Sequence, residues 1–153
     1  MSEEFICVQD TDYREYFENA GINTVFLLSE NMAESAWNRE IHIGASSYFD
    51  LPDDCWIIAS VAVPIGRWME AYNNDNNLLV EKLLRAEVGW PDDIFIKFFA
   101  KKKIVFRARW KDFLHYWDEF IAVEDDCPIV IPEKSPNKEA ILFRPIGDIV
   151  KIG

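Results

Sequence analysis

The sequence lacks the residue patterns that mark common catalytic and cofactor sites. Gly44, Gly66 and Gly147 stand alone, so no loop is rich enough in glycine to cradle a phosphate group. The two histidines, His42 and His115, lie far apart in the sequence, and no serine occupies a nucleophile-elbow motif. We therefore expect a binding protein that uses no cofactor, rather than an enzyme.

Cysteine is scarce, and long hydrophobic runs are missing. Cys7, Cys55 and Cys127 are widely separated, which argues against a disulfide framework and against a zinc site of the CxxC kind. The acidic start, Met1–Glu4, does not resemble a signal peptide. The longest fully apolar run, near residues 61–65, is far shorter than the ~20 residues that span a bilayer. We expect a cytoplasmic protein that does not contact a membrane.

Basic residues are outnumbered by acidic ones. Sixteen Lys and Arg stand against twenty-seven Asp and Glu, which leaves the chain of 153 residues with a formal charge of −11. A negative field of this size repels nucleic acid and attracts cationic molecules. We therefore expect a basic protein partner and no nucleic-acid partner.

Hydrophobic periodicity and turn residues predict a single α+β domain over residues 1–153, with one mixed, mostly antiparallel sheet, about four helices and a C-terminal β-meander. Strands are expected near residues 5–8, 24–28, 56–63, 94–99, 104–108, 129–131, 140–143 and 149–152. Helices are expected over residues 12–20, after Ser29, within 65–72, over 79–88 and over 110–121. The last of these is the clearest, because Trp110, Phe113, Leu114, Trp117, Phe120 and Ile121 share one helical face. In the helix over 79–88, Glu81 and Arg85 are expected to pair at i,i+4 on the exposed side, and Gly89 is expected to end the helix.

Three pairs of aspartates each precede an apolar run. They are Asp53-Asp54, Asp92-Asp93 and Asp125-Asp126. If the strands that follow run parallel and adjacent, the pairs meet at one sheet edge, where they could bind Mg²⁺ or Ca²⁺ or a cationic partner. If the strands run antiparallel, the pairs fall at opposite ends, and each is then a polar turn before a buried segment.

Charge is segregated in the second half of the chain. Residues 97–111 carry seven bases and no acid, whereas residues 118–126 carry five acids and no base. A basic hairpin with interleaved aromatic residues could touch nucleic acid, but the overall charge opposes that contact. Alternatively, the hairpin and the acidic segment pair with each other inside the fold.

The outward face of the predicted helix over 110–121 combines acids with a histidine and a tyrosine. Exposed acids near a helix C-terminus oppose the macrodipole and cost about 0.3–1 kcal/mol each. We interpret this arrangement as charge retained for a partner. The candidate partner-binding residues are His115, Tyr116, Asp118, Glu119, Glu124, Asp125 and Asp126, together with Asp92 and Asp93.

Aromatic residues beside acids recur in the sequence, as in Trp90-Pro91-Asp92-Asp93 and His115-Tyr116-Trp117-Asp118-Glu119. In this overall character the chain resembles the immunity proteins of bacterial toxin systems, such as polymorphic toxins and contact-dependent inhibition. The resemblance implies a protein that neutralises a cognate nuclease toxin by covering its cationic active site. Two alternatives remain open: an enzyme or metal-binding domain that uses clustered aspartates, and an oligomeric structural subunit joined through its aromatic residues.

Overall fold

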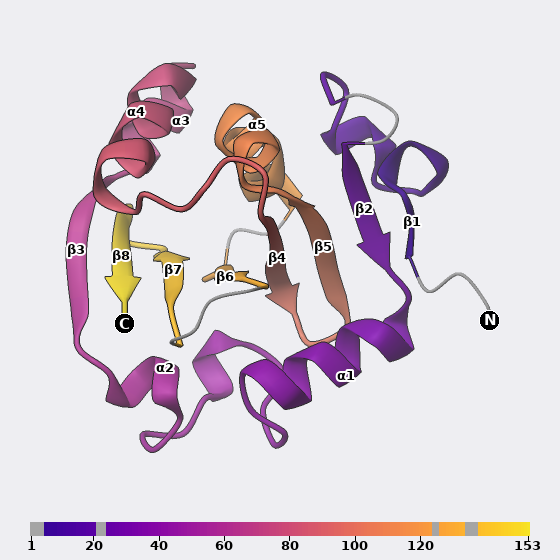
Figure 1. The fold of residues 1–153 in the computed structure, drawn as a ribbon, viewed down its shortest axis with the longest axis vertical. Helices are drawn as coiled ribbons and strands as arrows, with labels where there is room; N and C mark the ends of the chain where they lie inside the picture. The colour runs from indigo at the N-terminus through magenta and orange to yellow at the C-terminus, as the bar shows by residue number, and fades with distance from the viewer. Residues whose placement is uncertain (1–4, 21–23, 124–125, 134–137) are drawn as a thin grey trace.

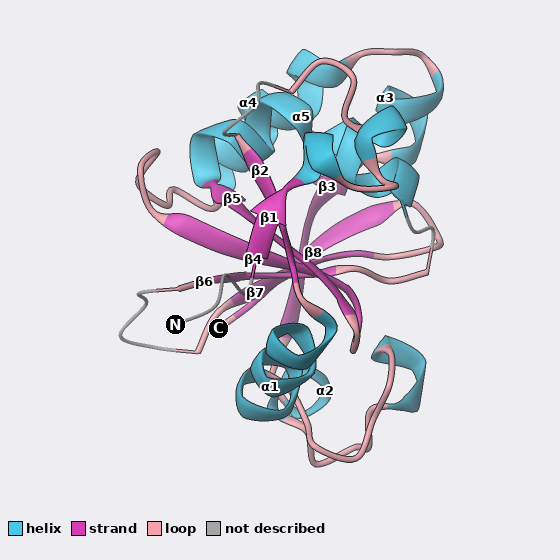
Figure 2. Cartoon of the chain, turned by 90° about the vertical axis from the view of Figure 1, so that its right-hand side faces the viewer, coloured by secondary structure: helices cyan, strands magenta, loops and turns pink. Residues whose placement is uncertain are grey.

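One eight-stranded antiparallel sheet runs through the protein and carries helices on both faces (Figures 1 and 2). The computed structural model describes residues 5–20, 24–123, 126–133 and 138–153. The strands lie in the order β1-β2-β5-β4-β6-β7-β8-β3, and every neighbouring pair is antiparallel. They are β1 (Phe5–Cys7), β2 (Val25–Leu28), β3 (Ala62–Arg67), β4 (Phe95–Lys101), β5 (Ile104–Arg109), β6 (Ile129–Pro132), β7 (Ala140–Phe143) and β8 (Asp148–Ile152).

The helices divide between the two faces of the sheet, as Figure 2 shows. One face is covered by α3 (Met69–Asn73), α4 (Asn77–Glu87) and α5 (Trp110–Val123), and the other by α1 (Glu30–Glu40) and α2 (Trp56–Ala59). In the described ranges, three 3₁₀ helices complete the elements: η1 (Val8–Asp10), η2 (Arg14–Tyr16) and η3 (Tyr48–Asp50). The predicted α+β class and the C-terminal meander β6-β7-β8 are therefore confirmed. No helix in the described ranges combines the length and apolarity that crossing a membrane requires.

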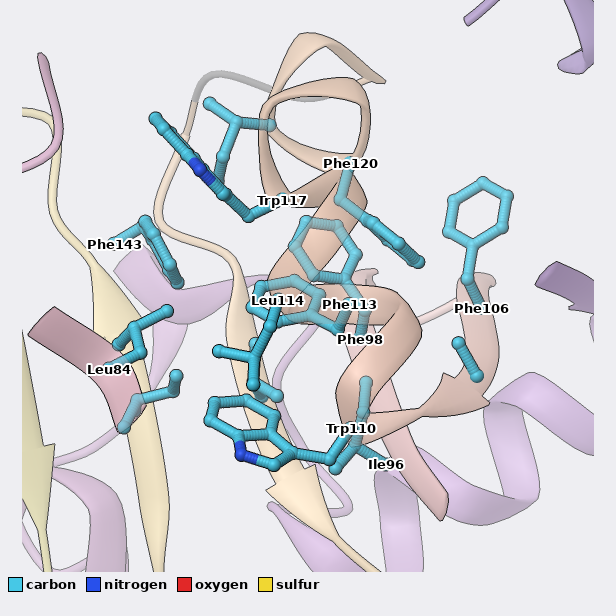
Figure 3. Close-up of a cluster of buried hydrophobic side chains, with 14 of the residues drawn as sticks. Leu84, Ile96, Phe98, Phe106, Trp110, Phe113, Leu114, Trp117, Phe120 and Phe143 are labelled. Carbon is cyan, nitrogen blue, oxygen red and sulfur yellow. The ribbon is translucent and has the colours of Figure 1, made fainter. Parts of the chain in front are cut away.

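The larger core lies between α5 and the sheet and is built from aromatic rings (Figure 3). The stripe predicted over residues 110–121 is fully buried there. Trp117 stacks on Phe143 of β7 at 6.3 Å between ring centroids, and Phe120 contacts Phe98 of β4 at 5.1 Å. Aromatic pairs at these separations stabilise the folded state beyond the contribution of burying their apolar surface. This packing fixes the position of α5 relative to the sheet.

Several local predictions are confirmed. Ser29 caps α1, because its hydroxyl accepts a hydrogen bond from the Met32 N–H at 3.2 Å. The basic segment forms the hairpin β4-β5, and Gly89 follows α4 with φ of 71°. A positive φ is readily adopted by glycine and stops the helix there.

The α-helix predicted over residues 12–20 does not form. Within this range the chain makes the short 3₁₀ helix η2 instead, and η1 precedes it. The Gln9 side chain donates to the carbonyl oxygens of Phe17 and Ala20 at 2.8 and 3.2 Å, and the Thr11 hydroxyl donates to the Val8 carbonyl. Side-chain hydrogen bonds of this kind compete with the helical backbone pattern. Phe17 and Ala20 are still buried, as an apolar helix face would be.

The strand predicted over residues 56–63 is also wrong. Trp56–Ala59 form α2, and the strand that follows, β3, continues through Pro64 rather than ending there. A short apolar run cannot by itself distinguish a strand from a buried helical turn. β3 is an edge strand with largely exposed side chains, and an edge tolerates a proline that lacks an N–H. The short helix expected within residues 65–72 is α3, which begins only at Met69.

Gly66 permits α4 to lie close against β3. A Cβ atom at this position would lie 2.1 Å from Cδ2 of Leu83. We expect Gly66→Ala to destabilise the protein by about 1–3 kcal/mol, because it overpacks this contact. Urea unfolding followed by tryptophan fluorescence measures the change.

The matched control is Gly44→Ala, whose Cβ would meet only the His42 side chain at 3.2 Å in an exposed loop. We expect that variant to unfold nearly as the wild type does. Adding Leu83→Ala to Gly66→Ala should recover part of the loss, since it removes the atoms that clash. Equal stabilities of the Gly66→Ala and Gly44→Ala variants would contradict this account of the packing.

Candidate functional site: an acidic groove between α4 and α5

A groove of about 320 Å³ lies where the start of α4 meets the middle of α5. α4 and α5 run antiparallel. Trp117 in the second half of α5 donates to the carbonyl of Asn77 at the start of α4 at 3.0 Å. Arg85 near the end of α4 reaches Asp92, whose carbonyl accepts from the N–H of Lys111 at the start of α5. The residues that line the groove are Asn19, Asn77, Leu78, Glu81, His115, Tyr116, Asp118 and Glu119. We call this surface the acidic groove. No Lys or Arg belongs to its lining in the described part of the chain.

A break in α5 shapes the groove. Tyr116 has φ of −115° and ψ of 21°, so α5 consists of two helical segments that meet there. Asp118 and Glu119 consequently lie in the first turn of the second segment, where the helix dipole favours negative charge. This corrects the interpretation that these two acids oppose the dipole at a helix C-terminus. Their presence near the break is compatible with local helix stability.

Glu119 is the buried acid of the groove, with 9% of its surface exposed. One carboxylate oxygen accepts a hydrogen bond from the Asn19 N–H at 3.0 Å. Burial raises the pKa of Glu119 above its ordinary value of 4.5, and the negative charges of Asp118 and Glu18 raise it further, against the opposing effect of the Asn19 hydrogen bond. Glu119 therefore places a partly desolvated carboxylate at the base of the groove.

A row of charged side chains leads along α4 into the groove. Asp92 lies 2.7 Å from Arg85, Arg85 lies 3.4 Å from Glu81, and Glu81 lies 3.9 Å from Nδ1 of His115. The predicted i,i+4 pair of Glu81 and Arg85 is thus confirmed. Asp92, predicted as a site residue, is connected to the groove through this row.

Tyr116 supplies a polar and aromatic edge. Burial is the main cause of the raised pKa of its phenol, and the nearby carboxylates of Glu119 and Asp112 contribute. The hydroxyl therefore remains protonated at neutral pH and can donate a hydrogen bond. The Tyr116 ring contacts the His115 ring edge to face at 4.8 Å, and the exposed side chain of Leu78 adds apolar surface opposite.

The structure brings together only part of the predicted site. His115, Tyr116, Asp118 and Glu119 line the acidic groove. Asp93 is exposed ahead of β4, and Asp126 precedes β6 beyond the end of α5. The two remaining candidates, Glu124 and Asp125, lie outside the described residues.

The aspartate pairs do not converge. β4 and β6 are antiparallel neighbours in which Phe99 is opposite Ile129, so Asp92-Asp93 and Asp126 lie at opposite ends of the sheet. Asp53-Asp54 precede the helix α2 rather than a strand. Within the described ranges, no group of three or more His, Cys, Asp or Glu is placed to hold a metal ion. The idea of a shared carboxylate cluster is therefore contradicted.

Sequence reasoning missed the other half of the groove wall. Asn19, Asn77 and Leu78 carry no signature of their own, and Glu81 was expected only as a surface ion pair. Asn77, Glu81 and Arg85 are spaced four residues apart, which places them on one face of α4. That spacing is the one signal in the sequence that pointed to this wall.

The bases of the hairpin also have partners that the sequence did not indicate. Lys97 pairs with Glu40 and Glu133 at 3.2 and 3.4 Å, and Arg107 pairs with Glu133 at 2.7 Å. The two bases therefore reach carboxylates on α1 and just after β6, rather than the acids of α5. The acidic groove is separated from these bases by the sheet.

The raised pKa of Glu119 leads to a prediction about stability and pH. The folded protein holds this proton more tightly than the unfolded chain, so the stability that the group contributes is present at low pH and is lost as pH rises from about 4.5 through the raised pKa. Glu119→Gln keeps an acceptor for the Asn19 N–H and removes the buried charge. We expect it to raise Tm at pH 7 and to leave Tm nearly unchanged at about pH 3.5.

Calorimetric melting at both pH values measures this effect. Glu15→Gln removes the same charge from an exposed side chain in η2 and serves as the control. A lower Tm for Glu119→Gln at pH 7, with Glu15→Gln unchanged, would show that the Glu119 charge stabilises the fold and would contradict the prediction.

Comparison with known proteins places the chain in a family without indicating an activity. No curated protein and no solved structure matches it significantly. A family model matches residues 14–153, a range that includes β2 to β8, α1 to α5 and every residue of the acidic groove. The chain therefore belongs to the family described as "Protein of unknown function (DUF2947)".

Proposed function

We propose that the protein binds a basic partner protein through the acidic groove. One observation carries the proposal: the carboxylates of Glu81, Asp118 and Glu119 line a single depression that, among the described residues, contains no Lys or Arg. A cationic side chain that entered this depression would meet the carboxylate of Glu119, held by the Asn19 N–H, and that of Glu81, held by Arg85. Binding would therefore cost little side-chain conformational entropy.

The groove combines the features of a recognition site for lysine or arginine. Glu119 is partly desolvated, and an ion pair with a partly desolvated carboxylate is stronger than one in water. Tyr116 and Leu78 offer aromatic and apolar contact beside the acids, and 55% of the Leu78 surface is exposed. Affinity at protein interfaces comes largely from such anchors, whereas charge complementarity sets the association rate and the register.

The charge of the whole chain supports the same kind of partner. At −11, the protein attracts cationic surfaces over distances set by the ionic strength. A nuclease active site is cationic because it must hold phosphate, so an acidic protein can cover it by presenting similar charge. We propose a nuclease toxin as the partner and inhibition as the function, in the manner of the immunity proteins that the chain resembles in character.

The test begins with the reading frame directly upstream of the gene for this protein, which the proposal expects to encode a nuclease-type domain. We expect the purified protein to stop that domain from degrading its nucleic-acid substrate at a molar ratio of about one, because occupation of one active site by one chain suffices. Raising the salt concentration should slow association, since exposed charges are screened.

Charge reversal locates the contact. Asp118→Lys should slow association by about tenfold or more at low salt, which is within the range that electrostatic steering contributes. Asp53→Lys changes the net charge equally on the opposite side of the sheet, and we expect a smaller effect. Stopped-flow or biolayer interferometry measures both rates. Equal slowing by the two variants would place the contact outside the groove, and the absence of inhibition would contradict the proposed function.

A further inference from the structure

A second pocket lies on the opposite face of the sheet, beneath α1. Its volume is about 300 Å³, at the lower end of the range for small-molecule sites. It is enclosed by α1, by β4 and β5, by the start of β1 and by the residue after β6. Its lining residues are Phe5, Met32, Ser35, Ala36, Arg39, Lys97, Arg107 and Glu133. We call it the α1 pocket.

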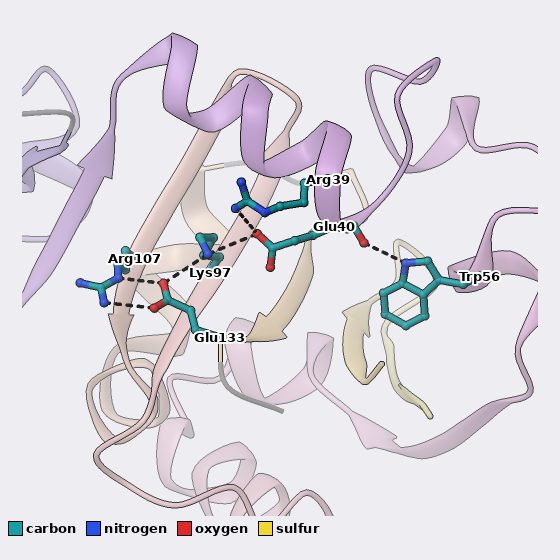
Figure 4. Close-up of polar contacts among 6 residues, drawn as sticks. All are labelled: Arg39, Glu40, Trp56, Lys97, Arg107 and Glu133. Atoms are coloured by element: carbon teal, nitrogen blue, oxygen red, sulfur yellow. Dashed lines mark hydrogen bonds and ion pairs between the residues drawn. The ribbon is translucent and has the colours of Figure 1, made fainter. Parts of the chain in front are cut away.

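Two cations lie directly opposite each other on the floor of this pocket. Lys97 of β4 pairs in register with Arg107 of β5, so both side chains project from the same face of the sheet. Like charges in this relation are destabilising unless an anion lies between them. Glu133 supplies that anion. Its carboxylate accepts hydrogen bonds from Nε and Nη2 of Arg107 at 2.7 and 3.0 Å, and it lies 3.4 Å from Nζ of Lys97 (Figure 4).

The charges around the pocket do not balance. Glu133 is shared between Lys97 and Arg107, and Glu40 is shared between Lys97 and Arg39 at 3.2 Å each. Among the described residues, three cations therefore stand against two carboxylates, and this cluster carries one net positive charge inside a strongly acidic protein. A bound anion would complete its neutralisation.

Two arginines that line the pocket carry hydrogen-bond donors that have no partner among the described residues. Guanidinium groups carry five N–H donors. Among the described residues, Arg107 uses Nε and Nη2, and Arg39 uses Nη2, which leaves Nη1 of both side chains. Cζ of Arg107 lies 3.7 Å from the centroid of the Phe95 ring, and this cation–π contact restrains the guanidinium group. The Ser35 hydroxyl lines the same pocket.

The network also ties α1 to the sheet, and the Glu40 carbonyl accepts a hydrogen bond from the Trp56 indole at 2.8 Å (Figure 4). That structural role does not require charge. Well-packed apolar residues often replace a buried ion network without loss of stability. Lys97 is nevertheless about nine-tenths buried among these charges. A ligand that uses the charges accounts for their presence.

We propose that the α1 pocket binds a small oxyanion, a phosphate or carboxylate group, between Arg39 at the mouth and Lys97 and Arg107 on the floor. Guanidinium groups match the geometry of both oxyanions and bind them with short, charge-assisted hydrogen bonds. This site is independent of the acidic groove, because the sheet separates the two and they share no lining residue.

The test is isothermal titration calorimetry of the full chain with inorganic phosphate, pyrophosphate and citrate, at ionic strength matched with NaCl. We expect saturable binding of at least one probe at about millimolar concentration or below, with a matching rise in Tm. Tighter binding of the two phosphates than of citrate assigns the site to phosphate groups, and the reverse order assigns it to carboxylates.

Arg39→Gln is the informative variant, because 64% of the Arg39 side chain is exposed and its loss leaves the buried part of the network in place. It should weaken binding of the best probe about tenfold, the loss expected for a hydrogen bond to a charged group. Arg67→Gln is the matched control: Arg67 is 55% exposed, pairs with Glu70 and lies outside the pocket. We expect it to bind as the wild type does.

Two results would overturn the proposal. One is the absence of saturable heat with all three probes up to about 10 mM, because a specific anion site formed by three cations should bind more tightly than that. The other is equal affinity of Arg39→Gln and the wild type for a probe that does bind, since that probe would then lie elsewhere on the chain.

Discussion

The packing of α5 on the sheet is the interaction on which the remaining structure depends. Its aromatic stripe, with Trp117 against Phe143 and Phe120 against Phe98, anchors the helix along β4 and β7. The same tryptophan donates to the Asn77 carbonyl and so fixes the start of α4. The break at Tyr116 lies beside this anchor, and Asp118 and Glu119, which follow the break, line the acidic groove. The acidic groove is thus a consequence of how the aromatic core is filled.

The antiparallel sheet also separates two regions of opposite charge. Side chains alternate between the faces of a strand, so Phe98 and Phe106 enter the aromatic core while their neighbours Lys97 and Arg107 project beneath α1. An acidic groove and a cationic pocket can therefore coexist about one sheet apart without neutralising each other. Their separation is what allows a chain with surplus negative charge to carry both the proposed anion site and the proposed surface for a basic partner.

Much of the fold was predictable from the sequence, because long segments with a clear hydrophobic period usually form the secondary structure that the period predicts. The stripe over residues 110–121 and the hairpin around Lys101–Lys103 were predicted with nearly correct boundaries. The errors fall where tertiary contacts override a local pattern. Gln9 bonds to Phe17 and Ala20 replace a helix, and an apolar run that begins at Trp56 becomes a helical turn whose indole reaches the Glu40 carbonyl. Of the candidate site, the α5 residues were found, but the α4 wall was not.

The sequence by itself determined the α+β class, the burial of the aromatic face of α5 and the negative charge of the whole protein. Net charge follows from the composition alone, and the hydrophobic period of a helix follows from the local order of residues. Tertiary structure decided which charges meet. Antiparallel pairing of β4 and β6 sent Asp92-Asp93 and Asp126 to opposite ends of the sheet, and the register of β4 with β5 placed Lys97 beside Arg107. Distances between side chains remote in sequence follow from strand order and register. Those depend on the summed packing of the whole chain, which no local pattern contains.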